Sequence, residues 1–253
     1  MKKQRIYNFV FSALAIVVLW VAWIVAYYTV RNDYVVPSFQ ETFLEVGRLL
    51  GEGAFWRAFG GTVLRTLWAF LVSLVLGVGL ALLSCFVRPV RAFLAPVVSV
   101  LRTVPTMALV LILLLLTRSP AVTPVIISAL VLLPAFYAAV LTSMDEVKGE
   151  YGELARTFKI SKGRQALKIY LPLAAPPVLG QTGATFSLGL KITVSGEVLS
   201  LTAKSIGSMM QWAQATLMSM PRLLALTLLV VLVGFAFEGL FALCYKLVVR
   251  WRA

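Results

Sequence analysis

Three ionisable residues lie inside otherwise apolar stretches of the chain, and their types and spacing indicate what they could do. Lys191 and Glu197 lie within residues 172–201, and Glu238 lies within 223–245. If these stretches cross a membrane, each charge is costly, by about 2.5–3.5 kcal/mol for Lys at mid-helix. Lys191 could bind an anion, or it could snorkel or pair with another helix. We expect Glu197 to have a gating or structural role and Glu238 to pair with a nearby base.

The sequence lacks the residue types that most enzymes and metal sites use. It contains no histidine, and its only cysteines are Cys85 and Cys244, so no common imidazole or multi-thiolate metal site can be built. Eight of the ten acidic residues lie in polar loops, which leaves no acid cluster for proton transfer or metal-assisted catalysis. No Gly-Lys-(Ser/Thr) sequence occurs, so a phosphate-binding loop is absent. We therefore predict no catalytic residue, metal or cofactor in this chain.

The composition is that of a membrane protein. Hydrophobic residues make up 60% of the 253 residues, charged residues make up 13%, and the mean hydropathy is +0.94. Soluble domains are roughly half apolar and about a quarter charged, so a soluble enzyme and a disordered chain are both excluded. A net charge of +13 would indicate nucleic acid in a soluble protein. Here the basic residues lie at the ends of apolar runs, which is typical of cytoplasmic loops. We predict a multi-pass protein of the cell membrane and no nucleic-acid partner.

The apolar runs predict an all-α protein with about six transmembrane helices, since about 20 apolar residues cross a bilayer. Their expected limits are 6–30, 67–87 (entered from about Thr62), 103–117, 119–144, 172–201 and 223–245. Gly60-Gly61 is expected to end the polar stretch before the second span. With the N-terminus in the cytoplasm, Lys and Arg concentrate in cytoplasmic segments, so both termini are expected there. We divide the chain into an anchor helix with an external loop (1–60) and a core (61–253).

The hydrophilic segment 145–172 is too long and too charged for a simple connection. Tyr151, Leu154 and Phe158 recur at three- and four-residue spacing, which predicts a short amphipathic helix. Ser161 is a suitable N-cap for a second short helix. The spacing alone fits two structures equally: a helix–turn–helix platform on the cytoplasmic face, or an interfacial amphipathic connector.

The same segment contains a recognisable pattern, formed by Glu153-Leu154-Ala155, Lys159 and Ile169-Tyr170-Leu171-Pro172. This segment resembles the "EAA" loop of permease subunits in binding-protein-dependent ABC importers. That signature is Glu-Ala-Ala, three residues, Gly, nine residues, then Ile-x-Leu-Pro, and every spacing is kept here. Leu154 replaces the middle Ala and Lys159 replaces the Gly. If that glycine is left-handed, a lysine there costs roughly 1–2 kcal/mol.

Two further blocks are similar to the nitrate/sulfonate/taurine branch of this family. Arg102-Thr103-Val104-Pro105 resembles its Arg-(Ser/Thr)-(Ile/Val)-Pro segment. Ser195-Gly196-Glu197-Val198-Leu199, followed by Ser205-Ile206-Gly207, resembles its Ala-Glu-(Met/Val)-Leu and Gly-(Ile/Leu)-Gly block. The matches cover roughly residues 60–240. They imply a type I importer permease fold, with the first helix added to a five-helix core.

The resemblance implies that the loop 145–172 docks as a coupling helix on a separate ATPase subunit, which binds ATP and Mg. The implied contact residues are Tyr151, Glu153, Leu154, Ala155, Arg156, Phe158 and Lys159. The aromatic and leucine side chains would supply apolar anchors, Ala155 would allow close approach, and Glu153 and Arg156 would pair with charges across the contact. The implied partners are two ATPase subunits, a second permease copy or a paralogue, and an extracytoplasmic solute-binding protein.

The resemblance also implies a translocation pathway for a small solute of the nitrate, sulfonate or taurine type. We expect Lys191, Ser195 and Glu197 to line this pathway or its gate. The main alternative is a self-contained secondary transporter or channel, which would have several ionisable groups near mid-membrane and would not need the spaced loop. A membrane-embedded enzyme would need an acid or histidine cluster. Co-purification of an ATPase and a solute-binding protein would separate these alternatives.

Overall fold

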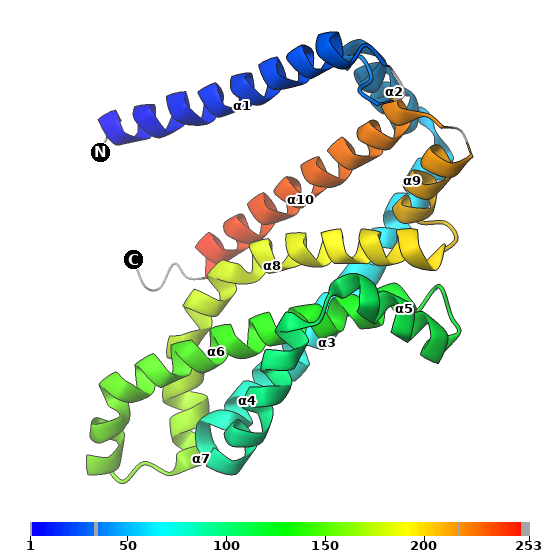
Figure 1. Ribbon diagram of the computed structural model, residues 1–253. Helices are drawn as coiled ribbons and strands as arrows, with labels where there is room; N and C mark the ends of the chain where they lie inside the picture. Colours follow the sequence, from blue (N-terminus) through cyan, green and yellow to red (C-terminus); the bar gives the residue numbers. More distant parts are fainter. Residues whose placement is uncertain (1, 33–34, 217, 249–253) are drawn as a thin grey trace. The chain divides into compact units, whose positions relative to one another are not determined.

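The computed structural model describes residues 2–32, 35–216 and 218–248, and all regular elements in these ranges are helical (Figure 1). The prediction of an all-α protein is confirmed. The elements are α1 (Lys2–Val30), α2 (Phe39–Gly51), α3 (Gly53–Phe86), α4 (Arg88–Thr103), α5 (Thr106–Thr117), α6 (Thr123–Thr157), α7 (Lys162–Gln165), the π-helix η1 (Ala166–Tyr170), α8 (Leu171–Ser200), α9 (Ile206–Ala215) and α10 (Met220–Val248).

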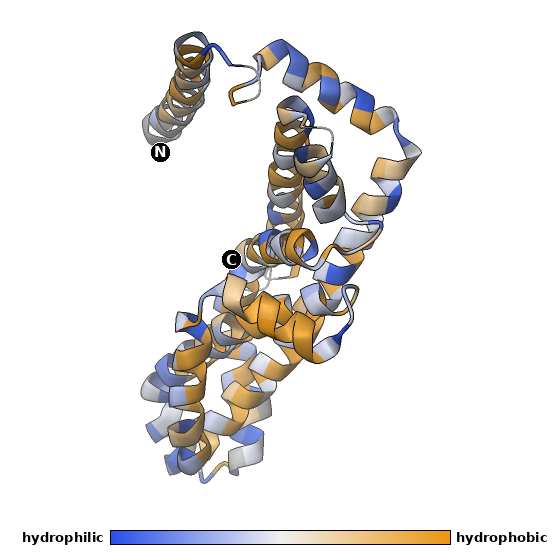
Figure 2. Cartoon of the chain, turned by 45° about the vertical axis from the view of Figure 1, so that its right-hand side comes forward, coloured by the Kyte–Doolittle hydropathy of each residue, from blue (hydrophilic) through white to orange (hydrophobic). Residues whose placement is uncertain are grey.

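Three of the described helices, α3, α6 and α10, are long and apolar enough to cross a membrane. Figure 2 shows hydrophobic residues over most of the turns of the long helices. The pair α4 and α5 passes the same test only when taken together, and it is bent by 103° at the break. With 12 residues, α5 is too short to cross alone, so the predicted third span is a broken one or a re-entrant loop.

The expected count of about six spans exceeds the three or four that length and composition support in the described residues. The apolar part found within α1 is the shorter stretch Val17–Val30. The 30-residue α8 contains Lys191, Glu197 and many small or polar side chains, which lower its hydropathy. The ends of the chain lie outside the described residues, and the cytoplasmic location of both termini stays a prediction.

Two helices continue where the sequence suggested a boundary. The helix α6 runs for 35 residues, so the fourth span and the first half of the polar loop form one element. Between Asp145 and Thr157, seven of the 13 residues are Glu, Lys, Ala, Leu or Arg, which favour helix, and the two glycines there do not end it. Similarly, Gly60 and Gly61 lie inside α3, so no break in the helix marks the expected end of the polar stretch. The predicted division after residue 60 stays a prediction.

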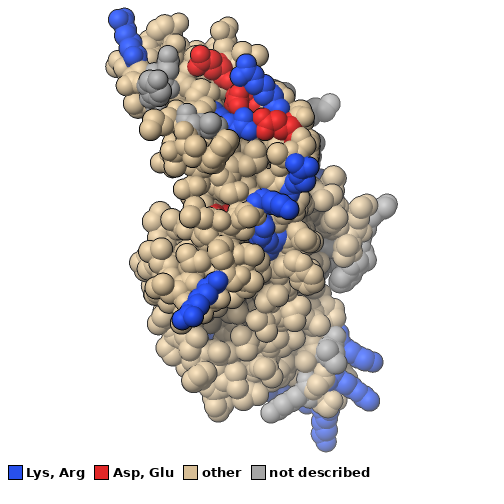
Figure 3. Space-filling view, turned by 90° about the vertical axis from the view of Figure 1, so that its right-hand side faces the viewer, with Lys and Arg blue, Asp and Glu red and all other residues tan. Residues whose placement is uncertain are grey.

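The described chain forms two compact units, and the first contains Met1–Trp56 with Met209–Leu229. Its helix α2 begins after Ser38, whose hydroxyl accepts a hydrogen bond from the Glu41 N–H. Arg222 bridges two carboxylates of this unit, those of Glu45 (2.8 Å) and Glu52 (2.6 Å). In Figure 3, acidic and basic side chains lie side by side in the upper part of the view.

The second unit contains Arg57–Ser208 with Val230–Ala253. One part of its core is aromatic, where Phe70 of α3 packs edge-on against Phe136 of α6 and Phe186 of α8, with ring centroids 5.2 and 5.5 Å apart. A second cluster surrounds Met144 and Tyr170, both nearly inaccessible to solvent. These two clusters hold α3, α6 and α8 together, so both ends of the polar segment 145–172 are anchored to the core.

Candidate functional site

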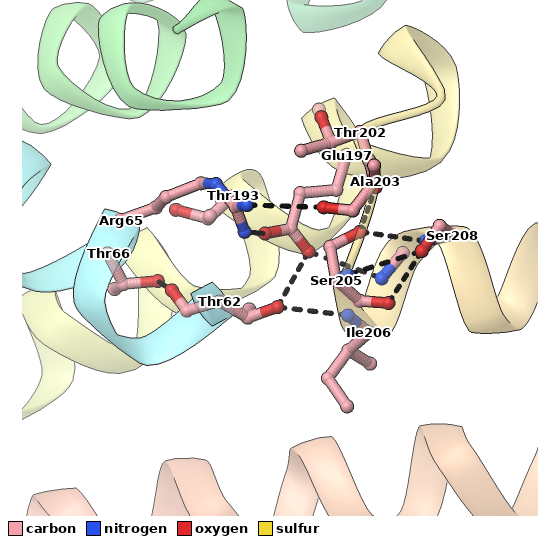
Figure 4. A network of polar contacts seen from close by, with 12 residues as sticks. Thr62, Arg65, Thr66, Thr193, Glu197, Thr202, Ala203, Ser205, Ile206 and Ser208 are labelled. Carbon is pink, nitrogen blue, oxygen red and sulfur yellow. Dashed lines mark hydrogen bonds and ion pairs between the residues drawn. The ribbon is translucent and has the colours of Figure 1, made fainter. Parts of the chain in front are cut away.

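The carboxylate of Glu197 is the centre of a buried polar network near the end of α8. Its side chain is 0% exposed. Glu197 Oε1 accepts a hydrogen bond from Arg65 Nη1 at 2.8 Å, and Oε2 accepts from Thr62 Oγ1 at 2.9 Å and from the Gly207 N–H at 3.2 Å (Figure 4). Thr62 and Arg65 are three residues apart on α3 and therefore share a face. One carboxylate thus joins α3, α8 and the first turn of α9.

The same two residues of α3 also hold the connection between α8 and α9. The Ile206 N–H donates to Thr62 Oγ1 at 3.0 Å, and Arg65 Nη2 donates to the carbonyl oxygen of Ala203 at 3.4 Å. No buried side-chain nitrogen or oxygen of the described residues lacks a hydrogen-bond partner. A fully satisfied buried network of this kind rigidifies the elements that it joins.

The close approach of α9 to α8 depends on Gly207. A Cβ atom there would lie 2.4 Å from the Cβ of Glu197 and 2.6 Å from the backbone nitrogen of Val198, distances that no side chain tolerates. Ser205 caps α9, because its Oγ accepts from the Ser208 N–H at 2.9 Å while Ser208 Oγ accepts from the Ser205 N–H at 3.2 Å. The Ser-Ile-Gly segment therefore has a structural reason: a cap followed by a contact that only glycine allows.

This geometry favours a structural role for Glu197 over a gating one. Removing one partner of a buried ion pair costs about 3–5 kcal/mol, and Arg65 is only 18% exposed. The sequence-based reading missed both Arg65 and Thr62. The sequence does contain a signal for these two residues. Arg65 is a single cation near the start of an apolar run, and it follows Thr62, which carries a hydroxyl, by three residues.

The structure brings Lys191 and Ser195 together on one face of α8, away from Glu197. Ser195 Oγ donates to the carbonyl oxygen of Lys191 at 3.0 Å, within its own helix. Lys191 is exposed and lines a small cavity between α8 and α10, together with Glu238. The expectation that Glu238 pairs with a base is wrong within the described residues, since none of their cations lies within 4 Å of it.

Near the end of α6, the polar segment 145–172 exposes apolar side chains on the surface of the protein. Leu154 is 57% exposed and Phe158 is 69% exposed, and Glu153 and Arg156 beside them are also exposed. Ala155 is 1% exposed and packs within its own chain. Its small size is therefore used inside the protein, and the expected role of Ala155 as the point of close approach for a partner is not supported.

Lys159 adopts a left-handed conformation, which glycine adopts more readily than any other residue. Its φ is 47°, in the left-handed region. The Ile160 N–H donates to the Ala155 carbonyl oxygen at 3.0 Å, and the Lys159 N–H donates to that of Arg156 at 2.9 Å. These two bonds form a Schellman motif, which ends α6 and satisfies its last carbonyl groups. The turn is thus kept, and lysine there carries a cost of roughly 1–2 kcal/mol.

A polar groove of about 760 Å³ lies behind this loop, lined by Arg88, Asp145, Lys148, Glu153, Arg156 and Tyr170 among others. Arg91 of α4 makes two hydrogen bonds to Asp145 of α6, at 3.1 and 2.8 Å. Lys148 Nζ donates to the carbonyl oxygen of Cys85 in α3 at 3.2 Å. Burial raises the pKa of the Tyr170 phenol, whose hydroxyl donates to Gln165 Oε1 at 3.1 Å. These contacts tie the polar end of α6 to α3 and α4.

Residues 73–250 match the family described as "Binding-protein-dependent transport system inner membrane component". A probable ABC transporter permease protein of Haemophilus influenzae is 29% identical over 140 residues, covering 55% of this chain and 54% of that protein. The bicarbonate transport system permease protein CmpB of Synechococcus elongatus is 24% identical over 148 residues (58% and 52%). The putative aliphatic sulfonates transport permease protein SsuC of Bacillus subtilis is 27% identical over 159 residues (62% and 53%). The chain spans about half the length of these curated relatives.

Two solved structures share the fold. A chain of an amino acid ABC transporter crystallised with histidines superposes with a TM-score of 0.63 and 16% identity, covering 73% of this chain and 89% of that one. A chain of the inward-facing MetNI methionine ABC transporter gives 0.62 and 17%, covering 79% and 96%. The predicted importer-permease fold is confirmed by this similarity.

Proposed function

The chain belongs to the family of binding-protein-dependent transport system inner membrane components, and from that premise we propose that it is the permease subunit of an ATP-driven importer. It is a multi-pass component of the cell membrane and a transport component by family. In our proposal it forms the substrate pathway and receives the energy of ATP hydrolysis from a separate subunit, which holds ATP and Mg. No cofactor is assigned to this chain.

The observation that carries the proposal is the exposure of Leu154 and Phe158 at the end of α6. Two large apolar side chains in an otherwise charged segment are typical of a docking surface, because buried apolar anchors dominate the energy of an interface. Glu153 and Arg156 flank them and supply a polar rim. We assign Tyr151 and Lys159 to the edge of the same surface. The occupant that fits is a groove on the ATPase subunit.

The length of α6 supports a direct mechanical link. Its 35 residues extend about 52 Å as one helix, so the docking side chains and the membrane part belong to a single rigid element. The Arg91–Asp145 and Lys148–Cys85 contacts join this element to α4 and α3. Movement of the ATPase subunits would therefore be passed to three helices at once, and alternating access follows from their rocking.

We place Lys191 and Ser195 on the pathway side of α8. The Lys191 side chain is exposed to solvent. Its helix α8 nevertheless packs beside the membrane helix α6, since the hydroxyls of Thr193 in α8 and Ser128 in α6 are 2.8 Å apart. An exposed charge at membrane depth faces water or protein and not lipid. Permeases named for bicarbonate and for aliphatic sulfonates are among the relatives, which supports a small anionic solute. The further partners are a second permease copy or a paralogue, a second ATPase subunit and an extracytoplasmic solute-binding protein.

Co-expression with the ATPase subunit tests this proposal. We expect the wild-type permease to retain the ATPase through purification, and Phe158→Asp together with Leu154→Asp to lose at least nine-tenths of it. Thr157→Ala is the matched control, since Thr157 is also exposed but its hydroxyl bonds to the carbonyl oxygen of Glu153 in its own helix. Equal retention by all variants would contradict the docking assignment.

A further inference from the structure

The polar groove of about 760 Å³ behind the segment 145–172 has a surplus of positive charge. Five charged residues of the described chain line it: Arg88, Lys148, Arg156, Asp145 and Glu153. Both carboxylate oxygens of Asp145 are already hydrogen-bonded to Arg91, at 3.1 and 2.8 Å. Two further acids of α6, Glu146 and Glu150, do not line the groove. The groove therefore presents three cations and one carboxylate that no described cation pairs with.

The three cations keep most of their hydrogen-bond donors available. Lys148 uses one of its three N–H donors for the carbonyl oxygen of Cys85, at 3.2 Å. Within the described part of the chain, neither Arg88 nor Arg156 forms an ion pair or a side-chain hydrogen bond. Each guanidinium offers five donors. Together these groups suit an anion with several oxygen atoms.

The helical spacing in α6 leaves open space between the cations. Lys148, Gly152 and Arg156 follow one another at four-residue steps and therefore share a face of α6. Gly152 has no side chain, and a Cβ added there would only touch Cγ of Lys148, at 3.7 Å. Arg88 is the first residue of α4 and lines the same groove from another helix. An anion in the groove can thus contact cations from two helices.

The groove lies where the apolar part of α3 ends. Cys85 and Phe86, the last two residues of α3, line it, and Arg88 follows two positions later. Phe86 stacks on Tyr170, which also lines the groove, with ring centroids 5.9 Å apart and 16° between the planes. The headgroup region of a bilayer begins where its hydrocarbon core ends, and basic pockets at that level bind lipid phosphates. The groove combines such a basic lining with an aromatic wall.

We propose that this groove binds a phosphate monoester, with the phosphate oxygens at Arg88, Lys148 and Arg156. A phosphate monoester carries about 1.5–2 negative charges at pH 7. That charge matches the surplus of three cations over one carboxylate. The planar fork of N–H groups in arginine also fits phosphate oxygens better than a single point charge does.

The volume favours an esterified phosphate over the free ion. Small-molecule sites measure roughly 300–1,000 Å³, and the groove of about 760 Å³ lies within this range. The remaining space, next to Phe86 and Tyr170, is available to the ester substituent. Two sources offer this chemistry, the headgroup of phosphatidic acid and a soluble phosphate ester such as glycerol 3-phosphate. The site is built from this chain alone, so the inference does not depend on the proposed function.

Isothermal titration calorimetry on the purified full-length permease in neutral detergent micelles distinguishes the two sources. Dioctanoyl phosphatidic acid and glycerol 3-phosphate are titrated separately, and dioctanoyl phosphatidylcholine is the control for partitioning into the micelle. We expect phosphatidic acid to bind and phosphatidylcholine to give no saturable heat. Binding of phosphatidic acid alone would support a lipid headgroup as the source, and binding of glycerol 3-phosphate would support a soluble ester.

Three variants test whether the groove is the site. Arg88→Gln should weaken binding about tenfold, because it removes charged donors, whereas Arg88→Lys should retain part of the affinity. Gly152→Leu keeps every charge but fills the space between Lys148 and Arg156, and it should also weaken binding about tenfold. Leucine favours helix more than glycine does, so this loss does not reflect misfolding.

The matched control is Arg164→Gln, which removes one positive charge from the same polar segment. Arg164 is exposed and does not line the groove, so this variant should bind as the wild type does. An absence of binding by both probes, or unchanged affinity in Arg88→Gln or Gly152→Leu, would overturn the inference. So would an equal loss in Arg164→Gln or equal binding of phosphatidylcholine. These measurements need no ATPase subunit, and their outcome is therefore separate from the test of the proposed function.

Discussion

The guanidinium of Arg65 lies 2.8 Å from the carboxylate of Glu197, although the two residues are 132 positions apart in the chain. This ion pair, with Thr62 and the Gly207 N–H, fastens α3 to the end of α8 and the start of α9. Glu197, for which we expected a gating or structural role, is thus the centre of a buried polar network that joins three helices. In our proposal the moving parts of the pathway lie elsewhere, and the Lys191 face of α8 is exposed.

Loss of the Glu197 carboxylate should destabilise the fold. We expect Glu197→Ala to lower the free energy of unfolding by about 3–5 kcal/mol, because Arg65 is left without its partner in a buried site. Thr62→Val should cost about 1–3 kcal/mol, since it removes one donor and one acceptor. Thermal unfolding in detergent micelles measures both. Values within 0.5 kcal/mol of the wild type would show that the joint does not stabilise the protein.

Gly207→Ala should be severe for steric reasons. Its Cβ would lie 2.4 Å from that of Glu197, so α9 must move away and the Gly207 N–H bond must break. Gly60→Ala in α3 is the matched control, since no atom lies within 4 Å of the added Cβ. That variant should be neutral or more stable by about 0.5–1 kcal/mol, because alanine favours helix. Similar melting temperatures for the two variants would contradict the geometry of the joint.

Lys159→Gly should stabilise the loop after α6. The left-handed φ of 47° is strained for lysine and free for glycine, so the gain is roughly 1 kcal/mol after the greater entropy of the unfolded glycine chain is included. Hydrogen exchange of the Lys159 and Ile160 amides, which donate to Arg156 and Ala155, reports this change directly. Faster exchange in the glycine variant would mean that the Schellman turn is not the native state of the loop.

The sequence predicted the local features of this protein better than its long-range contacts. The position of Lys159 could be recognised because a left-handed residue after a helix is a local backbone requirement at a fixed spacing. The continuity of α6 through Asp145 was missed, because a change from apolar to charged residues marks a membrane boundary and does not end a helix. The partners of Glu197 could not be read from the sequence, since no periodicity links α3 to α8. The bend between α4 and α5 lies at Val104-Pro105, where the chain's Arg-Thr-Val-Pro segment ends.

Uptake into reconstituted vesicles tests most directly whether the exposed end of α6 couples transport to ATP. The permease is reconstituted with its ATPase subunit, the solute-binding protein is added outside with its labelled solute, and ATP is enclosed. We predict uptake that requires both ATP and the ATPase subunit and that falls at least tenfold in Phe158→Asp, while Thr157→Ala remains near wild type. Accumulation of solute in vesicles that contain the permease and no ATPase subunit would contradict the account.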